Sequence, residues 1–169
     1  VGGTSTFTAD GLANQDASLS GQNNRFGGAV SFAGTNGGSW DGVALKETDG
    51  GIELGATEVS GNFSLESTDG AITQSTGTTV GIGGTTTLTA SNGAPTPNFY
   101  DITLAESGND FGAEVRAIGR GIFLADTNAL TVHDLTASGN LLLSAGGNLV
   151  TEDGSGSGTD SLQADGNLR

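Results

Sequence analysis

The stretch Ser60–Leu65 (SGNFSL) returns later in the chain as Ser138–Leu143 (SGNLLL). Two further pairs of segments match in the same order: Val1–Ala9 (VGGTSTFTA) with Ile82–Ala90 (IGGTTTLTA), and Asn24–Val30 (NRFGGAV) with Asn109–Val115 (NDFGAEV). The members of each pair are about 80 residues apart, and self-similarity at a fixed period is the signature of a repeat architecture. We therefore predict a single solenoid segment over residues 1–169, made of two long repeats at about 1–81 and 82–169.

A shorter rhythm lies inside each long repeat. Runs such as Ala29–Phe32 (AVSF), Ile52–Leu54 (IEL) and Ile102–Leu104 (ITL) alternate apolar and polar residues, which is the period of a β-strand. Glycine, Asn and Asp separate the runs, as turns with positive φ require. Because strong two-residue hairpin signals are few, we expect an all-β parallel solenoid with roughly 20 residues per coil. An antiparallel β-sandwich is the alternative.

The apolar residue of each alternating run should point into the solenoid, where stacked coils cover one another. The predicted inward positions are Phe7, Val30, Phe32, Val43, Leu45, Ile52, Leu54, Phe63, Leu65, Ile72, Leu88, Ile102, Leu104, Val115, Ile122, Leu124, Leu130, Val132, Leu141, Leu143 and Leu149. The Ser-Gly-Asn turns at residues 60–62 and 138–140 suggest a ladder of stacked Asn side chains.

The charge of the chain restricts its partners. The formal net charge is −14, from 19 acidic and five basic residues, and a basic patch cannot be assembled from these. We therefore exclude nucleic acid as a partner, because its binding depends on clusters of Lys and Arg. No apolar run approaches the length of a membrane span, so we expect no membrane insertion. There is no Cys, which is compatible with export in an unfolded state.

Three segments resemble the repeats of a known protein family: residues 139–149 (GNLLLSAGGNL), 126–132 (DTNALTV) and 83–90 (GGTTTLTA). They look like the repeats of filamentous-haemagglutinin-type adhesins, the large exoproteins of two-partner secretion and autotransporter-like systems. The resemblance covers nearly the whole chain and is one of composition and rhythm. It implies a right-handed parallel β-helix, secretion to the bacterial cell surface, and a structural or adhesive role in cell adhesion, biofilm or cell–cell contact.

Catalysis is not expected from this sequence. His133 is the only histidine, and its neighbour Asp134 should point to the opposite face of a strand. Carboxylate pairs at Glu47 and Asp49, Asp101 and Glu106, and Glu152 and Asp153 lie in turn-like contexts, where side chains bond nearby backbone. We expect a non-enzyme without a cofactor. A carbohydrate-binding or carbohydrate-active β-helix is the alternative.

Few residues qualify as binding sites. Residues 156–162 partly match a calcium-binding nonapeptide pattern, which makes Asp160 a weak calcium candidate. Trp40, Phe99 and Tyr100 interrupt the strand rhythm, and exposed aromatic residues often mark recognition sites. A loop aromatic folded over a coil edge is the simpler interpretation of all three.

The expected partners are more coils of the same kind and a surface molecule. The chain begins at Val1 and stops at Arg169, which we interpret as a fragment of a larger repetitive protein. An uncovered coil is an open sheet edge that invites pairing. We therefore expect continuation of the solenoid or end-to-end self-association, and a host or bacterial surface glycan or protein as a possible ligand.

Overall fold

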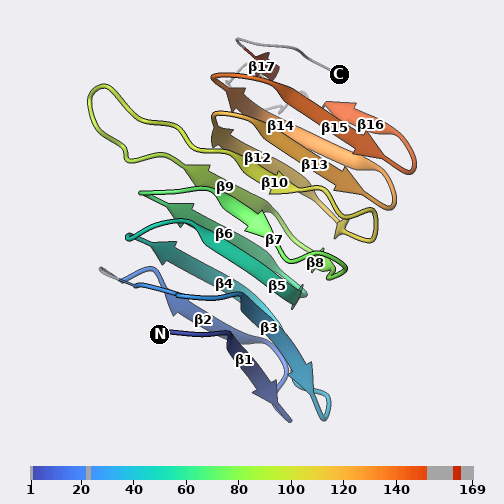
Figure 1. Ribbon diagram of the computed structural model, residues 1–169. Helices are drawn as coiled ribbons and strands as arrows, with labels where there is room; N and C mark the ends of the chain where they lie inside the picture. The colour runs from blue at the N-terminus through green and yellow to red at the C-terminus, as the bar shows by residue number, and fades with distance from the viewer. Residues whose placement is uncertain (1, 22–23, 152–161, 165–169) are drawn as a thin grey trace.

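The computed structural model describes residues 2–21, 24–151 and 162–164. Over these residues the chain forms a parallel β-solenoid of about 6 turns, spaced roughly 23 residues apart, with no helix. Figure 1 shows the coils stacked into an elongated body with one sheet on each side. All pairings between the named strands of the described chain are parallel, which confirms the predicted solenoid and excludes the antiparallel sandwich.

Each coil contributes strands to two sheets. The first sheet contains β1 (Ser5–Asp10), β3 (Val30–Thr35), β5 (Ile52–Val59), β7 (Ile72–Gln74), β8 (Val80–Ile82), β10 (Ile102–Leu104), β11 (Asp110–Phe111), β13 (Ile122–Asp126) and β15 (Leu141–Ala145). The second sheet contains β2 (Gln15–Leu19), β4 (Trp40–Glu47), β6 (Asn62–Ser67), β9 (Thr86–Ala90), β12 (Glu114–Gly119), β14 (Leu130–Ala137), β16 (Leu149–Thr151) and β17 (Leu162–Ala164).

The core consists of apolar ladders that run along the stack. In the first sheet Ile52, Ile72, Ile102, Ile122 and Leu141 occupy successive coils in register, and all are at most 1% exposed. A second ladder runs through the other sheet by way of Leu45, Leu65, Leu88, Ala117 and Leu135. Each coil alone leaves these side chains in water, so the core exists only because coils cover one another.

Most predicted inward positions are buried, and three are not. Phe7 and Leu143 are partly buried against the core. Leu149 was predicted to be inward but is 50% exposed. It belongs to β16, which ends the strand order of the second sheet and pairs with β14 on one side only. In the part of the chain that the structure describes, Leu149 therefore lacks the covering coil that buries Leu130 beside it.

Two of the three pairs of segments that match at long range lie on opposite sheets. Ser60–Leu65 enters β6 of the second sheet, whereas Ser138–Leu143 enters β15 of the first. Val1–Ala9 contains most of β1 in the first sheet, whereas Ile82–Ala90 contains β9 in the second. A separation of about 80 residues is about three and a half coils of this spacing. The stacking unit of the structure is the single coil, and the division into two long repeats stays a prediction.

The expected ladder of stacked Asn side chains is wrong. Asn62 and Asn140 stand at the starts of strands in different sheets, so they do not stack. Asn62 is in register with Gly42, and its Oδ1 accepts a hydrogen bond from the backbone N–H of Thr85 at 2.9 Å. The side chain still joins neighbouring coils, but it does so through the backbone.

Candidate functional site

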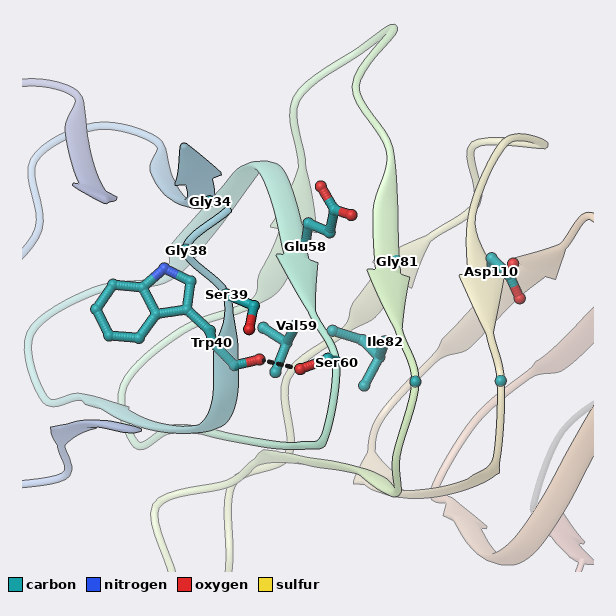
Figure 2. Close-up of a pocket in the computed structure, with 12 residues that line it drawn as sticks. Gly34, Gly38, Ser39, Trp40, Glu58, Val59, Ser60, Gly81, Ile82 and Asp110 are labelled. Carbon is teal, nitrogen blue, oxygen red and sulfur yellow. Dashed lines mark hydrogen bonds between the residues drawn. The ribbon is translucent and has the colours of Figure 1, made fainter. Parts of the chain in front are cut away.

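A groove of about 410 Å³ lies at the edge where the chain turns from the first sheet into the second. Its outer row consists of Glu58, Gly81 and Asp110, which are in register on β5, β8 and β11. Figure 2 shows these three positions side by side, whereas Trp40 lies outside the row with its indole ring turned away from it. We call this site the edge groove, defined by Trp40, Glu58, Gly81 and Asp110.

Trp40 lines the edge groove, but its ring packs against the core and is held in place by two contacts. Its ring meets that of Phe32 edge to face, with the centroids 6.0 Å apart. Its indole Nε1 donates a hydrogen bond to the carbonyl oxygen of Ala33 at 3.1 Å. The backbone oxygen of Trp40 accepts the Ser60 hydroxyl at 2.7 Å, drawn as the dashed line in Figure 2. These contacts fix the position of the ring.

Two glycines of the edge are glycines for different reasons. A Cβ on Gly83 would lie 2.3 Å from the carbonyl oxygen of Ser60, so the close approach of two coils excludes any side chain there. A Cβ on Gly81 would meet no atom nearer than the carbonyl oxygen of Thr57 at 4.0 Å, and Gly81 does not have a positive φ. The fold does not require glycine at position 81. A glycine inside a strand can instead mark the close approach of a ligand.

A buried amide network holds the strands that carry the edge groove. The Asn109 side chain is fully buried, and its Oδ1 accepts hydrogen bonds from the backbone N–H of Val80 at 2.9 Å and from Gln74 Nε2 at 2.7 Å. Its Nδ2 donates to Gln74 Oε1 at 3.0 Å and to the carbonyl oxygen of Leu104 at 3.2 Å. Val80 and Asn109 immediately precede Gly81 and Asp110, so this network fixes both of them.

A buried carboxylate holds β11, the strand that carries Asp110. Asp126 is 4% exposed, and its Oδ2 accepts the backbone N–H of Phe111 at 2.7 Å. In the described chain β11 has β8 as its only strand partner, so the carboxylate takes the place of a further strand. Asp126 Oδ1 also accepts the backbone N–H of Asn128 at 2.6 Å. Both oxygens of this side chain therefore serve the fold.

Unlike the Asp126 carboxylate, the Glu58 and Asp110 carboxylates do not stabilise the fold of the described chain through hydrogen bonds. Both residues are exposed, and neither carboxylate forms a hydrogen bond or ion pair within the part of the chain that the structure describes. Of the described residues that line the edge groove, none is positively charged. The edge groove therefore presents two free acceptor groups on either side of the gap at Gly81.

Of the three predicted recognition aromatics, only Trp40 lines the edge groove. Residues 91–99, between β9 and β10, form an excursion from the opposite edge of the solenoid (Figure 1). Phe99 is its last residue, and Tyr100 follows directly. Tyr100 packs against the core, and its hydroxyl bonds Asp69 at 3.2 Å. Burial and the Asp69 carboxylate raise the pKa of Tyr100 above its ordinary value. Trp40 and the other two aromatics do not form one site.

His133 and Asp134 are arranged differently from the simple alternation expected of a strand. Val132 and Leu135 both point inward, so a β-bulge places two residues where the facing strand has only Arg116. Asp134 takes a φ of 53°, and its Oδ2 lies 2.7 Å from His133 Nδ1. The His133 side chain is only 15% exposed, so it is mostly covered.

Turn chemistry also differs in detail from the prediction at Glu47 and Asp49. Glu47 is fully buried, and its carboxylate accepts the backbone N–H groups of Phe26, Thr48 and Asp49 at 2.8, 3.1 and 2.9 Å. Burial raises the pKa of Glu47 against the opposing effect of these donors. Asp49 instead pairs with Arg25. Glu47 thus bonds nearby backbone as predicted for this pair, whereas Asp49 forms an ion pair.

In the second carboxylate pair, Asp101 likewise forms structural hydrogen bonds. Asp101 accepts two hydrogen bonds from Arg120, at 2.8 and 2.6 Å, and one from the backbone N–H of Gly121 at 3.0 Å. These donors hold the pKa of Asp101 below its ordinary value, with the Arg120 bonds as the main cause. Glu152, Asp153 and the calcium candidate Asp160 lie outside the described residues.

The described chain contains neither a cluster of metal-binding side chains nor a membrane-spanning helix. No group of three or more His, Asp or Glu side chains there is placed to hold a metal ion. The same residues include no helix that is long and apolar enough to cross a membrane. A second hollow, of about 380 Å³, lies on the second sheet and is lined by Asp16, Asn62 and Thr85 among others.

Part of the chain is similar to a known family of repeats. Residues 42–117, somewhat less than half of the chain, match a family described as Repeats of unknown function (DUF5649). No match was found among curated proteins or among solved structures. The matched span contains Glu58, Gly81 and Asp110 of the edge groove and begins just after Trp40. The match to a family of repeats and the parallel coils of the structure together fit a repeat β-solenoid protein.

Proposed function

We propose that this chain is a structural and adhesive segment of a large secreted bacterial surface protein, and that it performs no catalysis. The observation that carries the proposal is the pair of core ladders that run from coil to coil along the described chain. Because each coil is completed by its neighbours, such a chain gains length without gaining a separate globular core. This is the property needed of a stiff spacer that carries a binding surface away from a cell.

The charge and the resemblance support the same assignment. A net charge of −14 keeps an exposed protein soluble and away from nucleic acid and anionic membranes. The rhythm of residues 83–90, 126–132 and 139–149 resembles that of filamentous-haemagglutinin-type adhesins. Adhesion, secretion and a place on the bacterial surface come to this chain from that resemblance.

We also propose that the solenoid associates with further coils of its own kind. In the described chain β1 and β2 each pair with one neighbour only, β3 and β4. A parallel strand with a free ladder side is a template for another strand. Electron microscopy of the purified chain at rising concentration should show rods that lengthen in steps. Single rods of one length at every concentration would contradict self-association.

Adhesion is tested directly with coated particles. Fluorescent beads that carry the purified chain should bind bacterial or epithelial cells in greater numbers than beads that carry an acidic globular protein of similar charge. The excess should disappear when soluble chain is added as a competitor. Equal binding of the two bead types to every cell tested would remove the adhesive part of the proposal and leave the spacer.

A further inference from the structure

We infer that Asn92 is a site of spontaneous covalent modification, at which the fold promotes loss of the side-chain amide through attack by the backbone nitrogen of Gly93. The inference goes beyond the proposed function and holds whether or not the chain is adhesive. Asn-Gly occurs in the sequence at residues 36–37 and 92–93. Because glycine has no side chain to shield its nitrogen, this attack is least hindered where Gly follows Asn. The two Asn-Gly sites, however, lie in opposite surroundings.

The reaction needs no partner other than water. The Gly93 nitrogen loses its proton and bonds to Cγ of Asn92, and negative charge develops on Oδ1 in the tetrahedral intermediate. The Cγ–Nδ2 bond then breaks, and the Nδ2 group takes up a proton and leaves as ammonia. Water opens the resulting five-membered imide at either carbonyl carbon, which yields aspartate or isoaspartate at position 92. No oxidant or reductant takes part.

The hydrogen bonds around Asn92 assist both bond-making groups of this reaction. Its Oδ1 accepts hydrogen bonds from the backbone N–H groups of Ala94 at 3.2 Å and of Asn98 at 3.0 Å. Two N–H donors aimed at the oxygen that becomes negative form the arrangement of an oxyanion hole. The Gly93 N–H donates to Ser91 Oγ at 3.3 Å, so the proton that must leave already points at an acceptor. Asn92 and Gly93 are exposed on the excursion that projects from the stack (Figure 1), so water reaches them.

Asn36 is also followed by glycine, but its hydrogen bonds are the reverse of those of Asn92. Its Nδ2, the group that would leave, donates to the Asp10 carboxylate at 2.6 Å. A carboxylate beside the amide opposes the development of a second negative charge on Oδ1. Asn36 also has a φ of 51° in a turn that is closed by the Gly38 N–H, which donates to the carbonyl oxygen of Thr35 at 2.8 Å. Asn92 Nδ2, in contrast, forms no hydrogen bond within the part of the chain that the structure describes.

The product is compatible with the place where it forms. A carboxylate at position 92 accepts the two N–H bonds better than a neutral amide oxygen does, so the same donors favour the aspartate product. Isoaspartate instead carries the main chain through the former side chain and lengthens the excursion by one carbon atom. The Tyr100 N–H closes the coil on the carbonyl oxygen of Ala90 at 2.9 Å, at the base of the excursion. The reaction therefore adds charge to the excursion as the protein ages and leaves the stacked coils intact.

The test compares each Asn-Gly site with itself in the folded and the unfolded chain. The purified full chain is kept in neutral buffer with and without denaturing guanidinium chloride, and samples withdrawn over time are diluted and digested with trypsin. Cleavage after Arg25, Lys46 and Arg116 places Asn36 and Asn92 in different peptides. Mass spectrometry measures the exchange of the amide for an acid, and electron-transfer fragmentation locates it and distinguishes aspartate from isoaspartate.

The two sites should respond to folding in opposite ways. We expect Asn92 to react in the folded chain at least as fast as in the unfolded chain, because the donors to its Oδ1 exist only in the fold. Asn36 should react at least about tenfold more slowly in the folded chain than in the unfolded chain. A folded rate at Asn92 below its unfolded rate would overturn the inference. Equal ratios of folded to unfolded rate at the two sites would also overturn it, because the surroundings would then decide nothing.

Two variants at position 94 isolate the effect of one donor. Ala94→Pro removes the N–H that points at Asn92 Oδ1, whereas the matched control Ala94→Gly keeps it. In the folded chain Asn92 should react about tenfold more slowly in Ala94→Pro than in Ala94→Gly, which is the effect of one hydrogen bond to a charged oxygen. In guanidinium chloride the two variants should react alike. Equal folded rates in the two variants would contradict the role of the donors and overturn the inference. Circular dichroism shows whether both variants are folded, and the wild-type comparison decides the question if Ala94→Pro is not.

Discussion

Gln74 and Asn109 exchange two hydrogen bonds inside the solenoid, although 35 positions separate them in sequence. Gln74 Nε2 donates to Asn109 Oδ1 at 2.7 Å, and Asn109 Nδ2 donates to Gln74 Oε1 at 3.0 Å. A buried amide is stable only when its donors and acceptors are satisfied. The pair therefore fixes how the coil of β7 and β8 sits on the coil of β10 and β11, and with it the shape of the edge groove.

Replacing one partner of this amide pair should lower the free energy of unfolding strongly, because polar groups of the other partner are then left unpaired. Asn109→Leu removes the partners of Gln74 Oε1 and of the Val80 N–H, so the free energy of unfolding should fall by about 2–4 kcal/mol. The double variant with Gln74→Leu should lose less than the sum of the two single changes, because two apolar groups then face each other. Urea unfolding of the four proteins measures this, and strict additivity would contradict the pairing.

The isoleucine ladder should be sensitive to truncation in a position-dependent way. Ile72 is fully buried between Ile52 and Ile102, so Ile72→Ala should lower the free energy of unfolding by about 3–4 kcal/mol through the cavity that it leaves. Ile118 is 42% exposed, and Ile118→Ala should cost less than about 1 kcal/mol. Urea midpoints of the two variants provide the comparison, and similar losses would argue against the ladder.

Glu47 should make stability depend on pH in an unusual direction. Its pKa is raised in the folded state, so over the titration range the folded chain holds a proton more tightly than the unfolded chain does. The contribution of Glu47 to the free energy of unfolding should therefore decrease as the pH rises through the raised pKa. Urea unfolding from about pH 4 to about pH 7, compared with Glu47→Gln, isolates this effect. A wild type that gains stability relative to Glu47→Gln over the same range would contradict it.

Asp101 should act in the opposite direction and more weakly. Because its pKa is lowered, its contribution to stability is present above the unfolded-state pKa and disappears as the pH falls through the folded-state pKa. The side chains of Arg120 and Asp101 are 62% and 36% exposed, so Arg120→Ala should cost only about 0.5–1 kcal/mol at neutral pH. Thermal melts at neutral pH and near pH 2 should show this difference shrinking in acid. A difference that is constant with pH would mean that the ion pair contributes nothing.

The two glycines of the edge should respond differently to the same substitution. Gly83→Ala places a methyl group against the carbonyl oxygen of Ser60 and should lower the melting temperature by several degrees, about 1–3 kcal/mol in free energy. Gly81→Ala has open space and should leave the melting temperature unchanged or slightly higher, because alanine restricts the unfolded chain. Calorimetry of both variants is sufficient. Equal destabilisation would mean that glycine at 81 is required by the fold.

The sequence predicted the strands well because their signal is local. Runs such as Ile52–Leu54 and Phe63–Leu65 alternate apolar and polar residues, and the structure places the apolar members in the core. The alternation of apolar and polar residues does not predict which polar residues are buried. Glu47, Asn109 and Asp126 look like turn residues in sequence, yet each is buried because a neighbouring coil supplies backbone N–H donors.

The candidate site was mostly invisible to the sequence because it depends on register. Trp40 stood out as an aromatic residue, but Glu58, Gly81 and Asp110 become neighbours only through the pairing of β5, β8 and β11. The irregular stretches at 75–79 and 105–109 set that pairing, and no local pattern fixes their length. The β-bulge at His133 and Asp134 was missed for the same reason, since a bulge is defined against the facing strand.

The excursion at residues 91–99 has a consequence for how such a chain can change. The Tyr100 N–H donates to the carbonyl oxygen of Ala90 at 2.9 Å, and Ser91 pairs with Phe99, so the coil is already closed at the base of the excursion. The residues of the excursion beyond this closure are not needed for the stacking of the coils. A different peptide could therefore replace them. The excursion is therefore a site that tolerates insertions. In evolution or by design, an epitope or a small domain can be inserted there while the stacked coils stay unchanged.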